Sequence, residues 1–205
     1  MELVEKNFDL LVTNSSSYNG GTGKACFTFL AKNIIDITKQ INTSTSKEYE
    51  GYTSSTAGGY GNSDIRSWLN STFYNGLDAD FRQVIKPVYK ISDKGNIPGT
   101  GLITTEEKVW LPSTTELNLD NLGAYSGLFY LDQSANGENY SWFSNDDTRI
   151  KYDKDKVARE YWTRTYSIIN PNRFMTIKHN GSLYVNNESG KTVWNYCSFV
   201  IGACV

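Results

Sequence analysis

The chain is organised around the stretch Gly58-Gly59-Tyr60-Gly61-Asn62-Ser63-Asp64-Ile65-Arg66-Ser67-Trp68-Leu69-Asn70-Ser71-Thr72-Phe73-Tyr74. Ser63 can accept a hydrogen bond from the first free N–H groups of a helix, and Asp64 follows where the helix dipole favours negative charge. The large apolar side chains that come next share one helix face, at positions i, i+3, i+4 and i+8: Ile65, Trp68, Leu69 and Phe73. The stretch therefore predicts a glycine-rich turn leading into a short helix that serves the core.

Helix and strand signals continue on both sides of this stretch. Asp78 is a second N-cap and Pro87 a helix terminator, so we expect short helices near 63–75 and 78–86. Ser113 and Glu116 have capping-box spacing, which predicts a helical turn, and a further turn is expected from Thr104 or Thr105 to Glu107. The segment 40–56 is polar and predicts an exposed loop. Strand patterns occupy the residues 7–13, 25–31, 88–92, 108–112, 161–166, 174–178, 183–185 and 194–205.

No shift in composition divides the chain, so we expect one α+β domain over residues 1–205. It would contain an antiparallel sheet with two short helices and long loops. Residues 1–24 would form an N-terminal strand and turn region, and residues 118–160 a long irregular insertion. The N- and C-terminal regions are expected to lie close together in the sheet.

Charge and cysteine usage exclude several classes of protein. The net charge is −2 with basic and acidic residues interleaved, so we expect no nucleic-acid partner. No run of 18 apolar residues occurs, so membrane insertion is not expected, and residues 1–6 lack the apolar core of a secretory signal. Cys26, Cys197 and Cys204 lack metal-ligand spacing and are interpreted as buried free thiols of a protein made in a reducing cytoplasm. We expect no metal and no cofactor.

Catalytic candidates are weak, and we expect a protein that is not an enzyme. His179 precedes Asn180-Gly181, a favoured hairpin turn, and is interpreted as a solvated turn residue. The adjacent acids Glu106-Glu107 and Asp146-Asp147 point apart on a strand, so they are poor glycosidase pairs. Arg66 and Arg164 lie beside tryptophans, where an arginine is expected to tie loops together through carbonyl groups or a carboxylate.

Aromatic and amide side chains gather in the last third of a chain that holds 14 tyrosines and 5 tryptophans. Two interpretations stay open: ordinary turns and strand ends, or a surface that binds sugars or protein epitopes by stacking and paired hydrogen bonds. We expect such contacts from loops near the C-terminal strands and not from the helix at 63–73. The candidate ligand-binding residues are Tyr166, Asn170, Asn172, Tyr184, Asn186, Asn187, Trp194, Asn195 and Tyr196.

Several motifs together resemble an uncharacterised domain family of Gram-positive bacteria and their phages. They are 30–35 (LAKNII), 58–60 (GGY), 63–70 (SDIRSWLN), 85–88 (IKPV), 109–116 (VWLPSTTE), 161–165 (YWTRT) and the closing strand. The resemblance implies a C-type-lectin-like fold and a place in phage tail or virion surface proteins, and it supplies no catalytic residues. The family often ends in a Gly-Val-Arg-Pro-like or Gly-Val-x-Phe-Gly-Phe-like stretch, which this chain replaces with Cys197–Cys204.

The resulting expectation is a binding module on a phage virion, as a tail fibre, baseplate or capsid decoration. Its partners would be a host cell-surface glycan or protein and other virion proteins, and it would form a homo-oligomer assembled in the host cytoplasm. The alternatives are a glycan-active hydrolase and a cytoplasmic bacterial protein that binds a ligand or acts as a scaffold.

Overall fold

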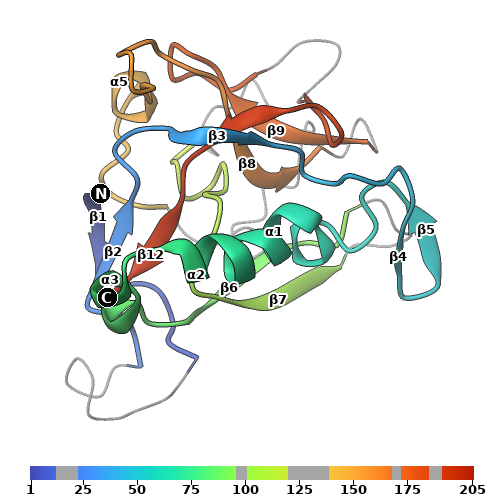
Figure 1. The fold of residues 1–205 in the computed structure, drawn as a ribbon, viewed down its shortest axis with the longest axis horizontal. Coiled ribbons are helices and arrows are strands. Elements are labelled where there is room, and N and C mark those ends of the chain that lie inside the picture. The colour runs from blue at the N-terminus through green and yellow to red at the C-terminus, as the bar shows by residue number, and fades with distance from the viewer. Residues whose placement is uncertain (13–22, 96–100, 120–138, 168–171, 185–190) are drawn as a thin grey trace.

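The structure is a computed structural model, and it describes residues 1–12, 23–95, 101–119, 139–167, 172–184 and 191–205. The described part is mixed α/β, with many strands and few short helices (Figure 1). The predicted strand 183–185 and the predicted insertion 118–160 fall partly outside these ranges.

The stretch 63–76 forms the helix that its sequence predicts. It runs through α1 (Asp64–Trp68), the π-helical turn η3 (Leu69–Phe73) and α2 (Tyr74–Gly76), after the 3₁₀ turn η2 (Tyr60–Asn62). Ser63 caps α1, since its Oγ accepts a hydrogen bond from the Arg66 N–H at 3.3 Å. Of the apolar face, Ile65 and Leu69 are fully buried, whereas Trp68 and Phe73 are half-buried at the edge of the core.

The second predicted helix and the predicted helical turn are also present. Asp78 caps α3 (Ala79–Val84) by accepting from the Asp80 N–H at 2.9 Å, and the helix ends before Pro87. Ser113 and Glu116 form a reciprocal capping box, in which each side chain accepts from the other's backbone N–H at 3.0 Å.

Within the described ranges, the strands form two larger sheets and two hairpins. One antiparallel sheet has the order β1-β2-β12, with β1 (Glu2–Lys6), β2 (Phe27–Leu30) and β12 (Gly202–Cys204). It brings the N- and C-terminal regions together, as expected (Figure 1). The hairpins are β4 (Lys47–Tyr49) with β5 (Tyr52–Ser54), and β6 (Val88–Asp93) with β7 (Leu102–Glu107).

The other sheet has the order β10-β9-β8-β11-β3. Its strands are β10 (Lys191–Thr192), β9 (Arg173–Ile177), β8 (Tyr161–Tyr166), β11 (Cys197–Phe199) and β3 (Ile35–Lys39). β11 pairs with β8 in the parallel direction, which corrects the expectation of an antiparallel sheet. The helix α1–α2 lies between this sheet and the β6–β7 hairpin, since Trp68 contacts Phe199 of β11 and Arg66 pairs with Glu107 of β7 (Figure 1).

Five other sequence predictions differ from the structure. The predicted strand 7–13 is displaced, because Asn7 has a positive φ of 52° and ends β1, and Leu10 and Leu11 form isolated bridges. The predicted loop 40–56 contains the β4–β5 hairpin, and the predicted turn at 104–107 belongs to β7. The predicted strand 194–205 divides into β11 and β12, which belong to different sheets. Residues 108–112 are buried at their centre but contribute one bridge, from Trp110 to Gly202.

The glycine-rich turn packs directly against the end of β6. Gly59 has φ 55° and ψ −146°, and a Cβ atom built on it would lie 1.9 Å from the carbonyl oxygen of Asp93. Glycine is therefore required at position 59, both by backbone conformation and by the close approach of β6. The turn delivers the fully buried Tyr60, whose hydroxyl accepts a hydrogen bond from the Leu111 N–H at 3.3 Å.

Asp93, at this junction, should make folding stability depend on pH. Burial raises the pKa of Asp93 to about 6, although its Oδ1 accepts a hydrogen bond from the Gly95 N–H at 2.6 Å. An aspartate in an unfolded chain has a pKa of about 3.9, so the folded state binds this proton more tightly. Its contribution to stability is complete below about pH 4 and is lost as the pH rises through about 6.

Asp93→Asn keeps the acceptor oxygen and removes the titration. Between about pH 4 and pH 7 the parent protein should lose about 2–3 kcal/mol of unfolding free energy relative to this variant. Urea denaturation at a series of pH values measures both proteins. Parallel stability curves for the two would show that Asp93 does not titrate in this range.

Candidate functional site

The loop after β3 is fixed to the start of α1. Asn42 is buried, donates to the Ser55 carbonyl at 2.8 Å and accepts from the Asp64 N–H at 2.9 Å. The Ile65 N–H donates to the Ile41 carbonyl at 3.0 Å. The loop after β3 and the start of α1 are therefore held together by hydrogen bonds, and they form the two walls of a pocket.

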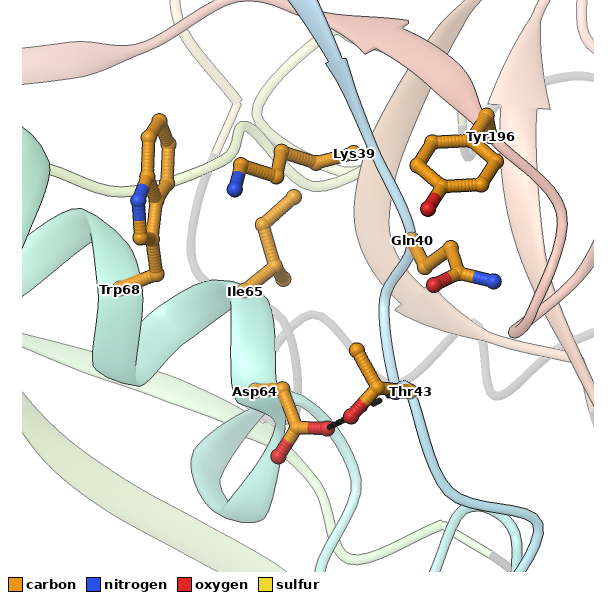
Figure 2. Close-up of a pocket in the computed structure, with 7 residues that line it drawn as sticks. All are labelled: Lys39, Gln40, Thr43, Asp64, Ile65, Trp68 and Tyr196. Carbon is orange, nitrogen blue, oxygen red and sulfur yellow. Dashed lines mark hydrogen bonds between the residues drawn. The ribbon is translucent and has the colours of Figure 1, made fainter.

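A pocket of about 230 Å³ lies between these walls. Figure 2 shows Trp68 and Ile65 on the α1 side and Tyr196, from the segment before β11, on the opposite side. The polar residues that line it are Lys39, Gln40, Thr43 and Asp64. The volume is smaller than the roughly 300–1,000 Å³ of sites for drug-sized ligands, so it suits one small chemical unit.

The two charged groups of the pocket are held in different ways. Burial opposes ionisation of Asp64, but hydrogen bonds from Lys47 and Thr43 outweigh it and lower the pKa of Asp64 below its usual value. The Lys39 ammonium lies over the Trp68 ring, 4.2 Å from its centroid, and Figure 2 shows it pointing toward that ring. Asp64 is thus neutralised by Lys47, while Lys39 supplies positive charge beside an aromatic wall.

The structure separates the ligand-binding residues predicted from sequence. Tyr196 is 67% exposed and lines the pocket, and Trp194 and Asn195 are exposed beside it in the chain. Tyr184 and Asn172 are partly exposed; Lys178 lies over the Tyr184 ring, and the Asn172 Oδ1 accepts from Ser55 at 2.5 Å. Asn170, Asn186 and Asn187 lie outside the described residues.

Tyr166 corrects the surface prediction, because it is 6% exposed and packs edge-on against Phe174 in the core. Conversely, the sequence assigned Trp68 to the core, yet this side chain forms one wall of the pocket. Helical periodicity could not separate Trp68 from Ile65 and Leu69. The size of the indole side chain is the sequence signal that could have indicated its role, because a ring of that length extends beyond the buried face of the helix.

Arg66 and Arg164 tie segments together, as the sequence predicted. Arg66 pairs with Glu107 and donates to the Gly61 carbonyl at 3.3 Å and the Glu106 carbonyl at 3.0 Å. Arg164 is fully buried, forms a two-pronged ion pair with Glu116 and donates to the Leu111 carbonyl at 3.0 Å. Arg66 thus joins α1 to β7, and Arg164 joins β8 to the segment 111–116.

Glu116 also belongs to a wider group of buried polar side chains that contains Asp9, Lys90 and the Tyr140 hydroxyl. Burial alone would raise the pKa of Glu116, but Arg164 and Lys90 lower it to about 2. Burial alone would lower the pKa of Lys90, but Asp9 and Glu116 raise it above its usual value. Arg164 and Lys90 thus stabilise the ionised form of Glu116.

The acidic pair Asp146-Asp147 and the single histidine lie in ordinary turns and helix ends. Asn145 caps α5 (Asp146–Arg149), so Asp146 and Asp147 form the first turn of a helix, and His179 is exposed next to the tight turn at Gly181. Across the described ranges, no three His, Cys, Asp or Glu side chains gather in a way that could hold a metal ion. The three cysteines are free thiols, of which Cys197 and Cys204 are buried and Cys26 is partly exposed.

A second pocket of about 380 Å³ lies along β3, beside Asp153 and Arg159. Those two residues pair with each other at 2.7 Å. The pocket contains no aromatic side chain among its lining residues, and its one cation, Arg159, already pairs with Asp153. The pocket at Trp68 and Tyr196 is therefore the stronger candidate.

Comparison with known proteins places the chain in a family. The model of a domain of unknown function, DUF6273, matches residues 27–198, which is most of the chain. The chain belongs to the DUF6273 family. No curated protein and no solved structure matches it.

The DUF6273 match runs from the first residue of β2 to the middle of β11. All seven residues of the pocket lie within it, whereas Asp9 and β12 lie outside. Among the helices of the described residues, none is both long and apolar enough to cross a membrane.

Proposed function

We propose that this DUF6273 protein is a non-catalytic binding module whose pocket holds one sugar unit of a cell-surface glycan. The observation that carries the proposal is the pairing of two aromatic walls, Trp68 and Tyr196, with polar groups between them. A sugar ring has an apolar face that packs on an aromatic ring and hydroxyl groups that bond amides and carboxylates. Gln40, Thr43 and Asp64 supply such groups.

Lys39 narrows the class of glycan. Its ammonium group lies at the pocket wall, and the pocket's carboxylate is already paired with Lys47. A sugar unit that carries a carboxylate or phosphate would meet Lys39 as a complementary charge. Acidic glycans should therefore bind more tightly than neutral ones of the same length.

A glycan hydrolase is less consistent with this pocket. Retaining and inverting glycosidases place two carboxyl groups across the scissile bond. Among the described residues that line the pocket, Asp64 alone carries a carboxyl group, and it is held ionised by Thr43 and Lys47.

Tyr196→Ala should weaken glycan binding without destabilising the protein. The side chain is 67% exposed, so its removal opens no cavity, and the melting temperature should stay within a few degrees. The dissociation constant for an acidic wall glycan should rise by about tenfold, which corresponds to roughly 1.4 kcal/mol. Isothermal titration calorimetry measures this change.

Two further variants complete the test. Lys39→Met should lose the preference for acidic over neutral glycan, whereas Tyr52→Ala, an exposed tyrosine outside the pocket, should bind like the parent protein. Equal affinities in the parent protein and Tyr196→Ala would exclude this pocket as the glycan site. Release of new reducing ends from the glycan by the parent protein would exclude a non-catalytic role.

The biological setting belongs to the same proposal and is supported by the sequence resemblance to phage surface modules. In this setting the fold is related to C-type lectins, and the module is displayed in several copies on a virion assembled in the host cytoplasm. The rival is a cytoplasmic bacterial protein with a regulatory or scaffolding partner. Mass spectrometry of purified particles decides between them, because absence of the chain from intact virions would exclude the first.

A further inference from the structure

Lys90 on β6 is buried against two carboxyl groups. Its side chain is 3% exposed, and its Nζ contacts the Asp9 Oδ1 and lies 2.8 Å from the Glu116 Oε1. The Tyr140 hydroxyl lies 2.7 Å from the same nitrogen, and the Trp110 ring covers it with a centroid 4.0 Å away. The amine is thus enclosed by two acids and two aromatic rings.

The carboxyl group of Asp9 is held in one orientation. Its Oδ2 accepts a hydrogen bond from the Thr28 hydroxyl at 2.6 Å and lies 3.4 Å from the Cys204 thiol. The Tyr140 hydroxyl lies 3.3 Å from this oxygen and 3.0 Å from the Glu116 Oε1, so it bridges the two acids. These contacts keep the side-chain carboxyl carbon of Asp9, Cγ, beside the Lys90 amine.

We propose that Lys90 and Asp9 are joined by an intramolecular amide bond, formed without another enzyme and with Glu116 as the proton carrier. In a rare, uphill step from the resting ion pair, Glu116 accepts a proton from the Lys90 ammonium, and the free amine attacks the Asp9 Cγ. A C–N bond forms, one C–O bond of Asp9 breaks, and its oxygen leaves as water with two protons from the ammonium. Tyr140 relays a proton between the acids, and no net proton is gained or lost.

Burial favours this condensation. An ammonium and a carboxylate are costly to hold away from water, and the amide that replaces them is neutral. Reactive groups held in contact have effective concentrations far above those in solution, and a site closed to water slows the reverse hydrolysis. The pair that remains, Glu116 with Arg164, is already balanced, so the reaction leaves no unpaired charge.

Lys151 provides a matched comparison. It is 1% exposed and its Nζ lies 2.9 Å from the Glu2 Oε2, so it is also a buried lysine in an ion pair. Glu2, however, is 25% exposed to water, and among the described residues no second acid and no tyrosine hydroxyl is bonded to Lys151 as they are to Lys90. Lys151 should therefore remain a free amine.

Intact mass spectrometry of the denatured protein, after prolonged incubation at neutral pH, tests the proposal. The purified protein should weigh less than its sequence by one water molecule, and Lys151→Met should show the same deficit. Lys90→Met and Asp9→Ala should have the full mass of their sequences, and Glu116→Gln should form the bond more slowly. Protease digestion should yield a branched peptide that joins the segments around Asp9 and Lys90.

The branched peptide separates the proposed bond from a cyclic imide at an aspartate, which has the same mass. If Lys90→Met does not fold, the mass of the parent protein and its digest still decide. A parent protein with the full mass of its sequence would overturn the proposal, and so would a mass deficit that maps to any other pair of residues.

Discussion

Replacing Arg164 with leucine should lower the free energy of unfolding by about 3–5 kcal/mol, because the change removes one of the two cations that pair with the buried Glu116 carboxylate. Glu116 is 1% exposed and receives two hydrogen bonds from the Arg164 guanidinium. Arg164 also satisfies the Leu111 carbonyl, which the leucine side chain cannot do. The pKa of Glu116, about 2 in the intact protein, should rise in the variant. Guanidinium chloride denaturation measures the loss.

Arg159→Leu is the matched control. Arg159 is 51% exposed and pairs with Asp153 at 2.7 Å, so its removal should cost less than about 1 kcal/mol. The double variant Glu116→Gln/Arg164→Leu should be more stable than Arg164→Leu alone, since Lys90 and Asp9 still balance each other. If the double variant is no more stable, the loss comes from packing and not from the unpaired charge.

Gly59→Ala should also cost about 3–5 kcal/mol, from backbone strain and a clash together. The backbone of Gly59 lies in a region that alanine rarely adopts, and the new methyl group would fall 1.9 Å from the Asp93 carbonyl oxygen. Because this oxygen belongs to the main chain of β6, neither partner can move without opening the turn. Thermal and chemical denaturation both report the loss.

Two other glycines separate the causes. Gly51 has φ +79° but open space around it, so Gly51→Ala measures strain alone, at about 1–2 kcal/mol. Gly76 has open space and no positive φ, so Gly76→Ala should be neutral or slightly stabilising. A Gly59→Ala loss no larger than that of Gly51→Ala would show that the β6 contact can relax.

Local signals in the sequence predicted local structure well. The caps at Ser63 and Asp78, the capping box at Ser113 and the helix at 63–75 each depend on residues within a few positions. The arginine ties were also predictable in kind, because a guanidinium beside buried aromatic residues needs acceptors. Their partners were not, since Glu107 and Glu116 are 41 and 48 residues away from Arg66 and Arg164.

Long-range pairing set the limits of prediction. The segment 194–205 is mostly apolar, and nothing in its pattern shows that it changes sheets between Phe199 and Gly202. The candidate pocket depends on the same pairing, because β11 places Tyr196 next to Lys39 only when Cys197 pairs with it. Tyr196 is exposed, as the sequence predicted for a surface residue. Tyr166 is buried because its strand, β8, is covered on both faces, which its local sequence does not show.

The change of sheets near the C-terminus has a consequence for biosynthesis. Residues 197–204 supply one strand to the five-stranded sheet and another to the sheet that contains β1. On the ribosome, residues 2–6 therefore emerge long before the strand that completes their sheet. The five-stranded sheet needs residues up to 199 and the sheet with β1 needs residues up to 204. Domains dominated by such distant pairings fold slowly. Folding of the two sheets therefore waits for residues 197–204, and the early strands need protection from neighbouring chains until those residues have been made.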